Sequence, residues 1–251
     1  MDSFISWVGG KKQLRKEIIK RFPVEGVEKY VEVFGGAGWV LFGKEPHKKE
    51  IYNDINGELV NLFRMIKYHP GALEAELVFL LNSREEFFRQ KVMQPERMTE
   101  LQRAARMFYL IKASYGSKVD TFGCGFRDVS VIKNLQEVHN RLACVLIENK
   151  SFEKIIQQHD GKGTLFYLDP PYHGTEEYYD LADVGFGKEQ HVLLRDILCG
   201  LKGKFVLSYN DDLFIRELYK GFSVKAVERS HNLGNAVGGK KIFEELIITN
   251  Y

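Results

Sequence analysis

The 251-residue sequence has only three cysteines, six prolines and no long hydrophobic run. The cysteines, Cys124, Cys144 and Cys199, are odd in number and widely spaced. This excludes a disulfide framework and a thiolate zinc site, and it fits a reducing, cytoplasmic environment. The seven histidines form no HxxxH or HxE pattern, which argues against a helix-borne metal site. No stretch approaches the ~18 consecutive apolar residues of a membrane span, and residues 77–81 are interpreted as a short core run.

The sequence also lacks an excess of charge of one sign. Its 36 basic and 34 acidic residues leave a net charge of +2, which neither demands nor excludes a nucleic-acid partner. Hydrophobic residues make up 44% of the chain and charged residues 28%, a balance typical of globular rather than disordered proteins. Internal repeats and Pro- or Ser-rich linkers are absent, so we expect one body with an insertion.

Short apolar strands alternate with helical segments along much of the chain, and the helical segment 188–199 separates the last two of these strands. The expected strands are residues 30–34, 50–53, 144–147, 165–168 and 205–208. This alternation predicts an α/β fold, with a mostly parallel sheet and helices on both faces. The last segments, 223–227 and 243–249, predict an antiparallel pair that closes one edge.

Residues 70–143 break this rhythm, because helical patterns over 73–81, 85–93 and 98–113 precede a Gly-rich, strand-prone piece, 115–132. We interpret 70–143 as a domain inserted after the second strand. Between Leu101 and Lys133 the sequence has six basic residues and only two acidic ones, and aromatic residues such as Tyr115 are interleaved with them. The six are Arg103, Arg106, Lys112, Lys118, Arg127 and Lys133. This pattern fits a nucleic-acid-reading element, although a solvated face over core aromatics is the simpler alternative.

The segment Phe34-Gly35-Gly36-Ala37-Gly38 lies between an expected strand and an expected helix. Glycines there allow a tight turn and a close approach of a ligand to the backbone. The pattern is not GxGxxG, which weakens a dinucleotide interpretation. Asp54 follows the next strand, where an acid can bind both hydroxyls of a ribose. Alternatively, Asp54 caps the following helix, for which Asn56 is also a candidate.

Asp169-Pro170-Pro171-Tyr172 is the strongest chemical signal in the sequence. It follows an apolar strand, so it is expected at the carboxyl edge of the sheet, where ligands bind in such folds. The prolines fix the backbone and leave carbonyl groups free to accept hydrogen bonds. Together with the Asp carboxylate and the flat Tyr ring, these acceptors suit an exocyclic amino group on a planar heterocycle. A rigid proline turn alone does not explain the flanking Asp and Tyr.

A Gly-Gly turn near the start, Trp7-Val8-Gly9-Gly10-Lys11, precedes an amphipathic helical segment with Leu14, Ile18 and Ile19. Such a turn with an aromatic residue and lysines could wrap a ligand. On chemistry alone, an ordinary helix start with solvated lysines is the preferred interpretation.

Taken together, these motifs resemble the Dam-type adenine-N6 DNA methyltransferases that use S-adenosylmethionine. The matches occur in the order of that family and cover the sheet almost from end to end. They are the segments 7–11, 31–38, 53–56 and 169–172, and the closing strand 244–251. The resemblance implies a Rossmann-like methyltransferase sheet formed by residues 1–69 and 144–251. It further implies that residues 70–143 form a target-recognition domain with helices and a β-hairpin.

The resemblance also implies roles for individual residues. Within the motifs, Asp54 would hold the ribose of the cofactor, and Phe34 and the glycines after it would shape the methionine pocket. Phe152, outside the motifs, resembles the position that flanks the adenine. The full set of expected cofactor contacts reverses the preferred interpretation of the N-terminal turn; it is Trp7, Lys11, Phe34, Gly35, Gly36, Gly38, Asp54, Phe152 and Asp169. Catalysis would rest on Asp169, Pro170 and Tyr172. Double-stranded DNA would be contacted by Lys112, Tyr115, Lys118 and Arg127. The expected protein is a monomer or weak dimer without a metal, of the kind found in restriction-modification systems. Its segment 115–132 departs from the family's hairpin that is associated with GATC recognition.

The expected reaction is methyl transfer to the amino group of an adenine flipped out of the duplex. Cytosine-N4 and RNA-adenine methyltransferases are the nearest alternatives, and Asp rather than Ser before the Pro-Pro pair favours adenine. A catalytically silent DNA-binding relative is a further alternative, against which the intact motifs argue. A nucleotide-dependent oxidoreductase is disfavoured because GxGxxG is absent.

Overall fold

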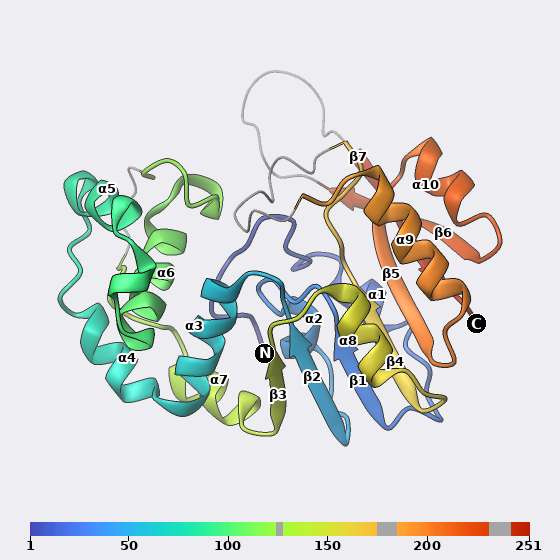
Figure 1. Cartoon of the computed structure of the whole chain (residues 1–251), viewed down its shortest axis with the longest axis horizontal. Helices are drawn as coiled ribbons and strands as arrows, with labels where there is room; N and C mark the ends of the chain where they lie inside the picture. Colours follow the sequence, from blue (N-terminus) through green and yellow to red (C-terminus); the bar gives the residue numbers. More distant parts are fainter. Residues whose placement is uncertain (124–127, 175–184, 231–241) are drawn as a thin grey trace.

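The computed structural model describes residues 1–123, 128–174, 185–230 and 242–251. Its centre is a seven-stranded sheet with the order β3-β2-β1-β4-β5-β7-β6 (Figure 1). The strands are β1 (Lys29–Glu32), β2 (Lys49–Asn53), β3 (Val145–Glu148), β4 (Thr164–Leu168), β5 (Lys204–Asn210), β6 (Ser223–Ser230) and β7 (Ile242–Thr249). The first five in the order are parallel, and β7 runs antiparallel to both β5 and β6. The predicted fold class, including the antiparallel edge, is confirmed.

The two faces of the sheet carry separate apolar cores, because successive strand residues point to opposite sides. Tyr30, Tyr52 and Tyr167 lie in one core, whereas their neighbours Val31 and Phe166 lie in the other. The first core is covered by α1 (Arg15–Ile19), α2 (Trp39–Gly43) and α3 (Gly57–Tyr68), and the second by α8 (Phe152–His159), α9 (Lys188–Cys199) and α10 (Leu213–Leu218). Helices therefore cover both faces, as predicted.

The strand order changes direction between β1 and β4, which lie side by side although residues 33–163 separate them in sequence. From β1 the chain proceeds outward to β2 and β3, and from β4 it proceeds the other way to β5. In open α/β sheets, ligands bind in the crevice outside the carboxyl ends of the strands at such a point. The turn 34–38 and the motif 169–172 are thereby brought to one place.

The segment 70–143 is mainly helical and consists of α4 (Pro70–Leu77), α5 (Arg84–Val92), α6 (Glu100–Ala113) and α7 (Leu135–Leu142), with short 3-10 turns η1 (Pro95–Arg97) and η2 (Tyr115–Ser117). Ser83 and Thr99 accept hydrogen bonds from backbone N–H groups at the starts of α5 and α6, as N-cap residues do. Phe87, Tyr109 and Leu110 form a small core of their own. Other residues of α4 and α6 join the core of the sheet, so the insert packs directly on α3.

Residues 124–127 of the expected β-hairpin lie outside the described residues, so the hairpin stays a prediction. The described residues of 115–132 form η2 and, with Ser114, an antiparallel bridge at Phe122. Positive φ angles at Gly116, Ser117 and Val119 prevent a regular strand there. The expectation that 77–81 is a core run was wrong: α4 ends at Leu77, and the following Val78, Phe79 and Leu81 are exposed.

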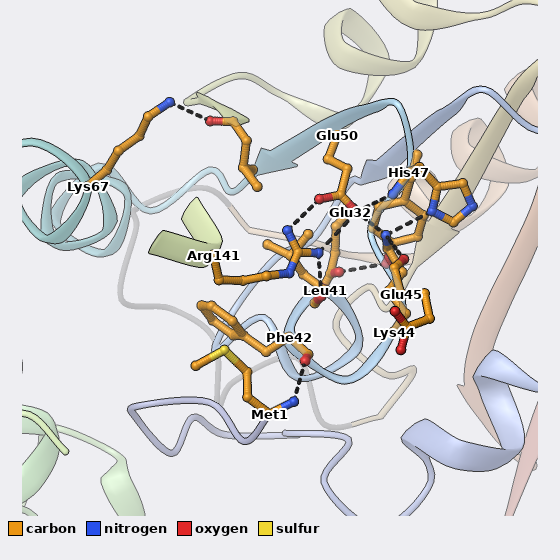
Figure 2. Close-up of polar contacts among 12 residues, drawn as sticks. Met1, Glu32, Leu41, Phe42, Lys44, Glu45, His47, Glu50, Lys67 and Arg141 are labelled. Atoms are coloured by element: carbon orange, nitrogen blue, oxygen red, sulfur yellow. Dashed lines mark hydrogen bonds and ion pairs between the residues drawn. The ribbon is translucent and has the colours of Figure 1, made fainter. Parts of the chain in front are cut away.

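A buried ionic cluster ties the end of the insert to the sheet (Figure 2). Glu50 on β2 forms ion pairs with Lys44, which follows α2, and with Arg141 of α7. Arg141 also donates a hydrogen bond of 2.9 Å to the carbonyl oxygen of Leu41. Glu32 lies beside this cluster, and burial raises the pKa of its carboxyl group to about 8. None of the helices in the described ranges is long and apolar enough to cross a membrane.

Candidate active site

A pocket opens at the carboxyl ends of β1, β2 and β4. It is lined by the N-terminal segment 7–11, the Gly-rich turn after β1, residues 54–56 after β2, the start of α8, and Asp169 after β4. Trp7, Lys11, Phe34, Gly35, Gly36, Asp54 and Phe152 all line this pocket. Of the expected cofactor contacts, Gly38 alone is not among the lining residues. The structure thus brings together motifs that lie far apart in the sequence.

The Gly-rich turn is held by backbone contacts and by its neighbour Tyr52. Gly35 N–H donates to the carbonyl oxygen of Asn53 at 2.7 Å, and the Tyr52 hydroxyl donates to that of Gly36 at 2.7 Å. A Cβ atom on Gly35 would lie 2.3 Å from the Tyr52 ring, and Gly38 has a φ of 68° that favours glycine. Glycine is therefore required at position 35 because the Tyr52 ring leaves no room for a side chain. The sequence indicated only a tight turn and the close approach of a ligand.

Asp54 closes the turn from the neighbouring strand. Its Oδ2 accepts a hydrogen bond from Gly36 N–H and its Oδ1 accepts one from Asn56 N–H, both at 2.8 Å. Burial raises the pKa of the Asp54 carboxyl group, and these backbone hydrogen bonds oppose the increase. The cap of α3 is Asn56, whose side chain accepts from two N–H groups of the first turn. The expected Asn56 cap is confirmed, and Asp54 serves the turn and the pocket.

Lys11 lies at the inner end of the pocket. It is only 3% exposed, and its Nζ lies 2.7 Å from Asp169 Oδ1 and donates to the Gly9 carbonyl oxygen at 2.9 Å. The interpretation of both lysines as solvated, drawn from chemistry alone, was wrong for Lys11; Lys12 is the exposed one of the pair. Trp7 packs beside Gly36, where an added Cβ would lie 3.1 Å from its ring.

Asp169 is held by two contacts and Tyr172 by a third. The Ser208 hydroxyl donates to Asp169 Oδ1 at 2.9 Å, and within the described part of the chain both this bond and the Lys11 ion pair involve Oδ1. Burial raises the pKa of Asp169, while Lys11 opposes the increase. The Tyr172 hydroxyl donates to Glu245 Oε2 at 2.9 Å, and Lys11 Nζ lies 4.7 Å from the centre of the Tyr172 ring. Pro170 between them is buried.

Ser208 on β5 and Glu245 on β7 are site residues to which sequence reasoning assigned no role. Glu245 is 3% exposed in a strand whose next three residues, 246–248, are buried and apolar. An acidic side chain at an inward position of such a strand is a signal that could have identified it, because burial of a charge requires a partner. Ser208, within the apolar strand β5, offered a weaker signal of the same kind.

Aromatic residues form one wall of the pocket. Phe152 at the start of α8 is buried and stacks on Phe34 with ring centres 5.8 Å apart. Phe186 packs edge-on against Phe34 at 5.7 Å. The expectation that Phe152 flanks the adenine of the cofactor stays a prediction, and Phe186 was not anticipated. This wall offers an apolar, aromatic surface in the same pocket as Asp54.

The expected DNA-binding residues lie on the insert. Tyr115 in η2 is 67% exposed, Lys118 is also exposed, and Lys112 near the end of α6 is half-buried, with its Nζ 5.7 Å from the centre of the Phe108 ring. Arg127 lies outside the described residues.

Two further basic residues of the pattern in 101–133 contact other helices of the protein. Arg103 forms an ion pair with Glu58 of α3, and Arg106 donates to the Gln90 carbonyl oxygen at 2.6 Å. Their side chains thus tie α6 to α3 and to α5, so only part of the positive charge in this region is available to a ligand.

Comparison with known proteins decides which family has this site. Residues 7–233 match the model of the D12 class N6 adenine-specific DNA methyltransferases. The chain belongs to this family. It is therefore an adenine-specific DNA methyltransferase by family, and the resemblance inferred from the motifs is confirmed.

The similarity to individual relatives extends over whole chains. The type II methyltransferase M1.LlaDCHI of Lactococcus lactis subsp. cremoris is 29% identical, covering 99% of this chain and 95% of its own. The type II methyltransferase M.CviBI of Paramecium bursaria Chlorella virus NC1A is 27% identical over the full length of both. The DNA adenine methylase of Haemophilus influenzae is 26% identical, covering 97% and 92%.

Proposed function

We propose that this enzyme binds S-adenosylmethionine in the pocket and transfers its methyl group to N6 of an adenine extruded from double-stranded DNA. The family supplies the reaction class. The observation that carries the assignment of residues is that Asp169, from the Asp-Pro-Pro-Tyr motif, lines the same pocket as Phe34, Asp54 and Phe152. One cavity thus joins the groups suited to a nucleoside cofactor to the group suited to an amino substrate.

The residues present fit the cofactor. The Asp54 carboxylate accepts backbone hydrogen bonds, and its two oxygens, with about four lone-pair sites between them, can also accept from a ribose hydroxyl. Phe34 and Phe152 offer an aromatic wall for the adenine ring, while Trp7 and the glycines shape the remainder of the pocket. When bound, S-adenosylmethionine supplies a methyl group made electrophilic by a positively charged sulfur.

The motif 169–172 is suited to hold the target base. Since Lys11 and Ser208 both contact Oδ1 of Asp169, Oδ2 is placed to accept an N6–H of adenine. The Pro170 carbonyl oxygen is the second acceptor in this proposal, and the Tyr172 ring is the stacking surface. Stacking contributes about 1–3 kcal/mol per base, which offsets part of the few kcal/mol that base extrusion costs.

The chemical contribution of these residues is to make a poor nucleophile reactive. The N6 lone pair of adenine is delocalised into the ring, and hydrogen bonds from both N6–H groups to Asp169 and Pro170 favour a pyramidal nitrogen. The freed lone pair can then attack in line. Asp169 need not be a strong base, because an N6 proton becomes acidic only as the N–C bond forms; positioning and electrostatics account for the rate.

The inserted segment 70–143 is the proposed DNA-recognition domain. Exposed Tyr115 and Lys118, half-buried Lys112, and Arg127 are the residues proposed to contact the duplex. Basic side chains of this kind neutralise phosphates, and an exposed aromatic ring can stack on a base. The enzyme is proposed to act as a monomer or weak dimer.

The experiment that tests this function uses the full-length protein with mixed-sequence double-stranded DNA and S-adenosylmethionine, followed by sequencing that maps modified bases. We expect N6-methyladenine at one short sequence motif. Parallel reactions contain RNA of the same sequences. Methylation of cytosine N4, methylation of RNA alone, or no transfer at all would each contradict the proposal.

A further inference from the structure

The Lys11 ammonium group faces two carboxylates rather than one. Its Nζ lies 2.7 Å from Asp169 Oδ1 and 3.9 Å from Glu245 Oε2. Glu245 comes from the antiparallel strand β7, which lies between β5 and β6, and it is opposite Asn210 of β5. Its side chain is 4% exposed, so this second carboxylate lies inside the protein beside the proposed substrate site.

The balance of charge at this point matters for the reaction. As the N6–C bond forms and the C–S bond breaks, the positive charge of the sulfonium moves to N6, and one N6 proton is then accepted by Asp169 or by water. A site that favours this step carries a net negative charge around N6. Lys11 and Asp169 alone sum to zero, whereas Lys11, Asp169 and Glu245 in their ionised forms sum to −1.

We propose that Glu245 is a positioning residue of the methyl-transfer site, which offsets the charge of Lys11 so that the negative charge of Asp169 acts on the substrate amine. The same carboxylate accepts the Tyr172 hydroxyl at 2.9 Å and so holds the stacking ring in place. This inference rests on the proposed function. It adds a residue from the closing strand 244–251, to which the resemblance assigned no role in the site.

The position of Glu245 in β7 supports a role in the site. Ile247, two residues further along the strand, lies in the first core of the sheet, while Leu246 and Ile248 lie in the other. Burial of a carboxylate on such a strand is costly unless charged or hydrogen-bonding partners compensate it. Glu245 contacts two motif residues, Lys11 and Tyr172. Glu244, the adjacent acid, is exposed and provides a matched control.

Three variants separate the effect of charge from that of hydrogen bonding. Glu245→Gln removes the charge but keeps an oxygen that can accept from Tyr172, whereas Glu245→Asp keeps the charge but withdraws the oxygens by one methylene. Glu244→Gln is the control, which removes a charge on the surface. The measurement is the single-turnover rate of methyl transfer from labelled S-adenosylmethionine to saturating DNA across pH, with cofactor and DNA affinities and thermal melting measured alongside.

We expect Glu245→Gln to lower the plateau rate roughly 10- to 100-fold, the range for a lost charge-assisted contact. Glu245→Asp should retain a higher rate than Glu245→Gln, and Glu244→Gln should match the wild type. The acid limb of the Glu245→Gln profile should move to lower pH, because Glu245 helps to raise the pKa of Asp169. The charged and titratable groups that face Asp169 in the described part of the chain are Lys11, Glu32, Tyr167, Tyr172 and Glu245.

The proposal is overturned if Glu245→Gln keeps the wild-type plateau, if its acid limb does not move, or if Glu245→Asp is the slower of the two. If Glu245→Gln does not fold, Glu245→Asp decides alone: a folded Asp variant below about a tenth of the wild-type plateau overturns the proposal. A wild-type enzyme that transfers no methyl group would instead contradict the proposed function, so the two failures are distinguishable.

Discussion

Lys11 Nζ and Asp169 Oδ1 lie 2.7 Å apart, although one comes from the N-terminal segment and the other from the end of β4. The ammonium group lowers the pKa of Asp169 against the opposing effect of burial. Lys11→Gln should therefore raise the pKa of Asp169, so the carboxylate is lost at higher pH and the acid limb of the methylation rate moves upward. Single-turnover rates across pH measure this, with the exposed neighbour variant Lys12→Gln as control. An unmoved or lowered acid limb in Lys11→Gln would contradict the assignment.

Gly35 should not tolerate a side chain, because a Cβ there would lie 2.3 Å from the Tyr52 ring and 2.8 Å from the Asn53 carbonyl oxygen. We predict that Gly35→Ala destabilises the protein by about 1–3 kcal/mol, as overpacking does, and weakens binding of S-adenosylmethionine. Urea unfolding and equilibrium binding measure the two effects. The matched control is Gly71→Ala in α4, where nothing lies within 4 Å. Equal behaviour of the two variants would show that the turn is less constrained than its geometry indicates.

Glu32 should make stability depend on pH. Burial raises its pKa from 4.5 to about 8 in the folded protein, so between these values the folded state binds more protons than the unfolded state. The contribution of Glu32 to stability is therefore present below about pH 4.5 and lost as pH rises toward 8. Glu32→Gln lacks this loss and should gain stability relative to wild type across that window, by on the order of a few kcal/mol. Urea unfolding at pH 5 and pH 9 measures it; a constant difference between the two proteins would refute the buried titration.

The basic residues of the insert should separate into two classes. Lys118 is exposed and proposed to contact phosphate, whereas half-buried Arg103 pairs with Glu58 of α3. We predict that Lys118→Gln reduces the slope of log affinity against log salt by about 0.9. Arg103→Gln should leave that slope unchanged and lower the melting temperature. DNA-binding titrations at several salt concentrations distinguish them, and identical slopes in all three proteins would exclude Lys118 as a phosphate contact.

Much of the sheet was predictable because its strands are short apolar runs bounded by polar turns. The motifs after β1, β2 and β4 were predictable as neighbours, since the carboxyl ends of parallel strands share one edge. The burial of Lys11 was not, because its sequence neighbours resemble a solvated helix start and its partners, Asp169 and Glu245, are distant in the chain. An ion pair of this kind depends on the tertiary structure, which places the N-terminal segment beside β4 and β7.

The insert was less predictable in detail. The Gly-rich, strand-prone composition and the family resemblance suggested a hairpin over 115–132, but positive φ angles at Ser117 and Val119 interrupt a regular strand there. Likewise, the basic pattern did not distinguish Arg103, which pairs with Glu58 of α3, from Lys118, which is exposed. Charge along a sequence does not indicate which basic side chains link helices and which lie at the surface.

The central claim is that Asp169 holds the adenine amine during methyl transfer, and Asp169→Ala tests it most directly. Single-turnover transfer of labelled methyl groups to saturating DNA is measured together with the affinities for DNA and S-adenosylmethionine. The account predicts that DNA affinity stays within a few-fold of wild type while methyl transfer is abolished. Substantial residual turnover in Asp169→Ala, with both ligands bound, would contradict it.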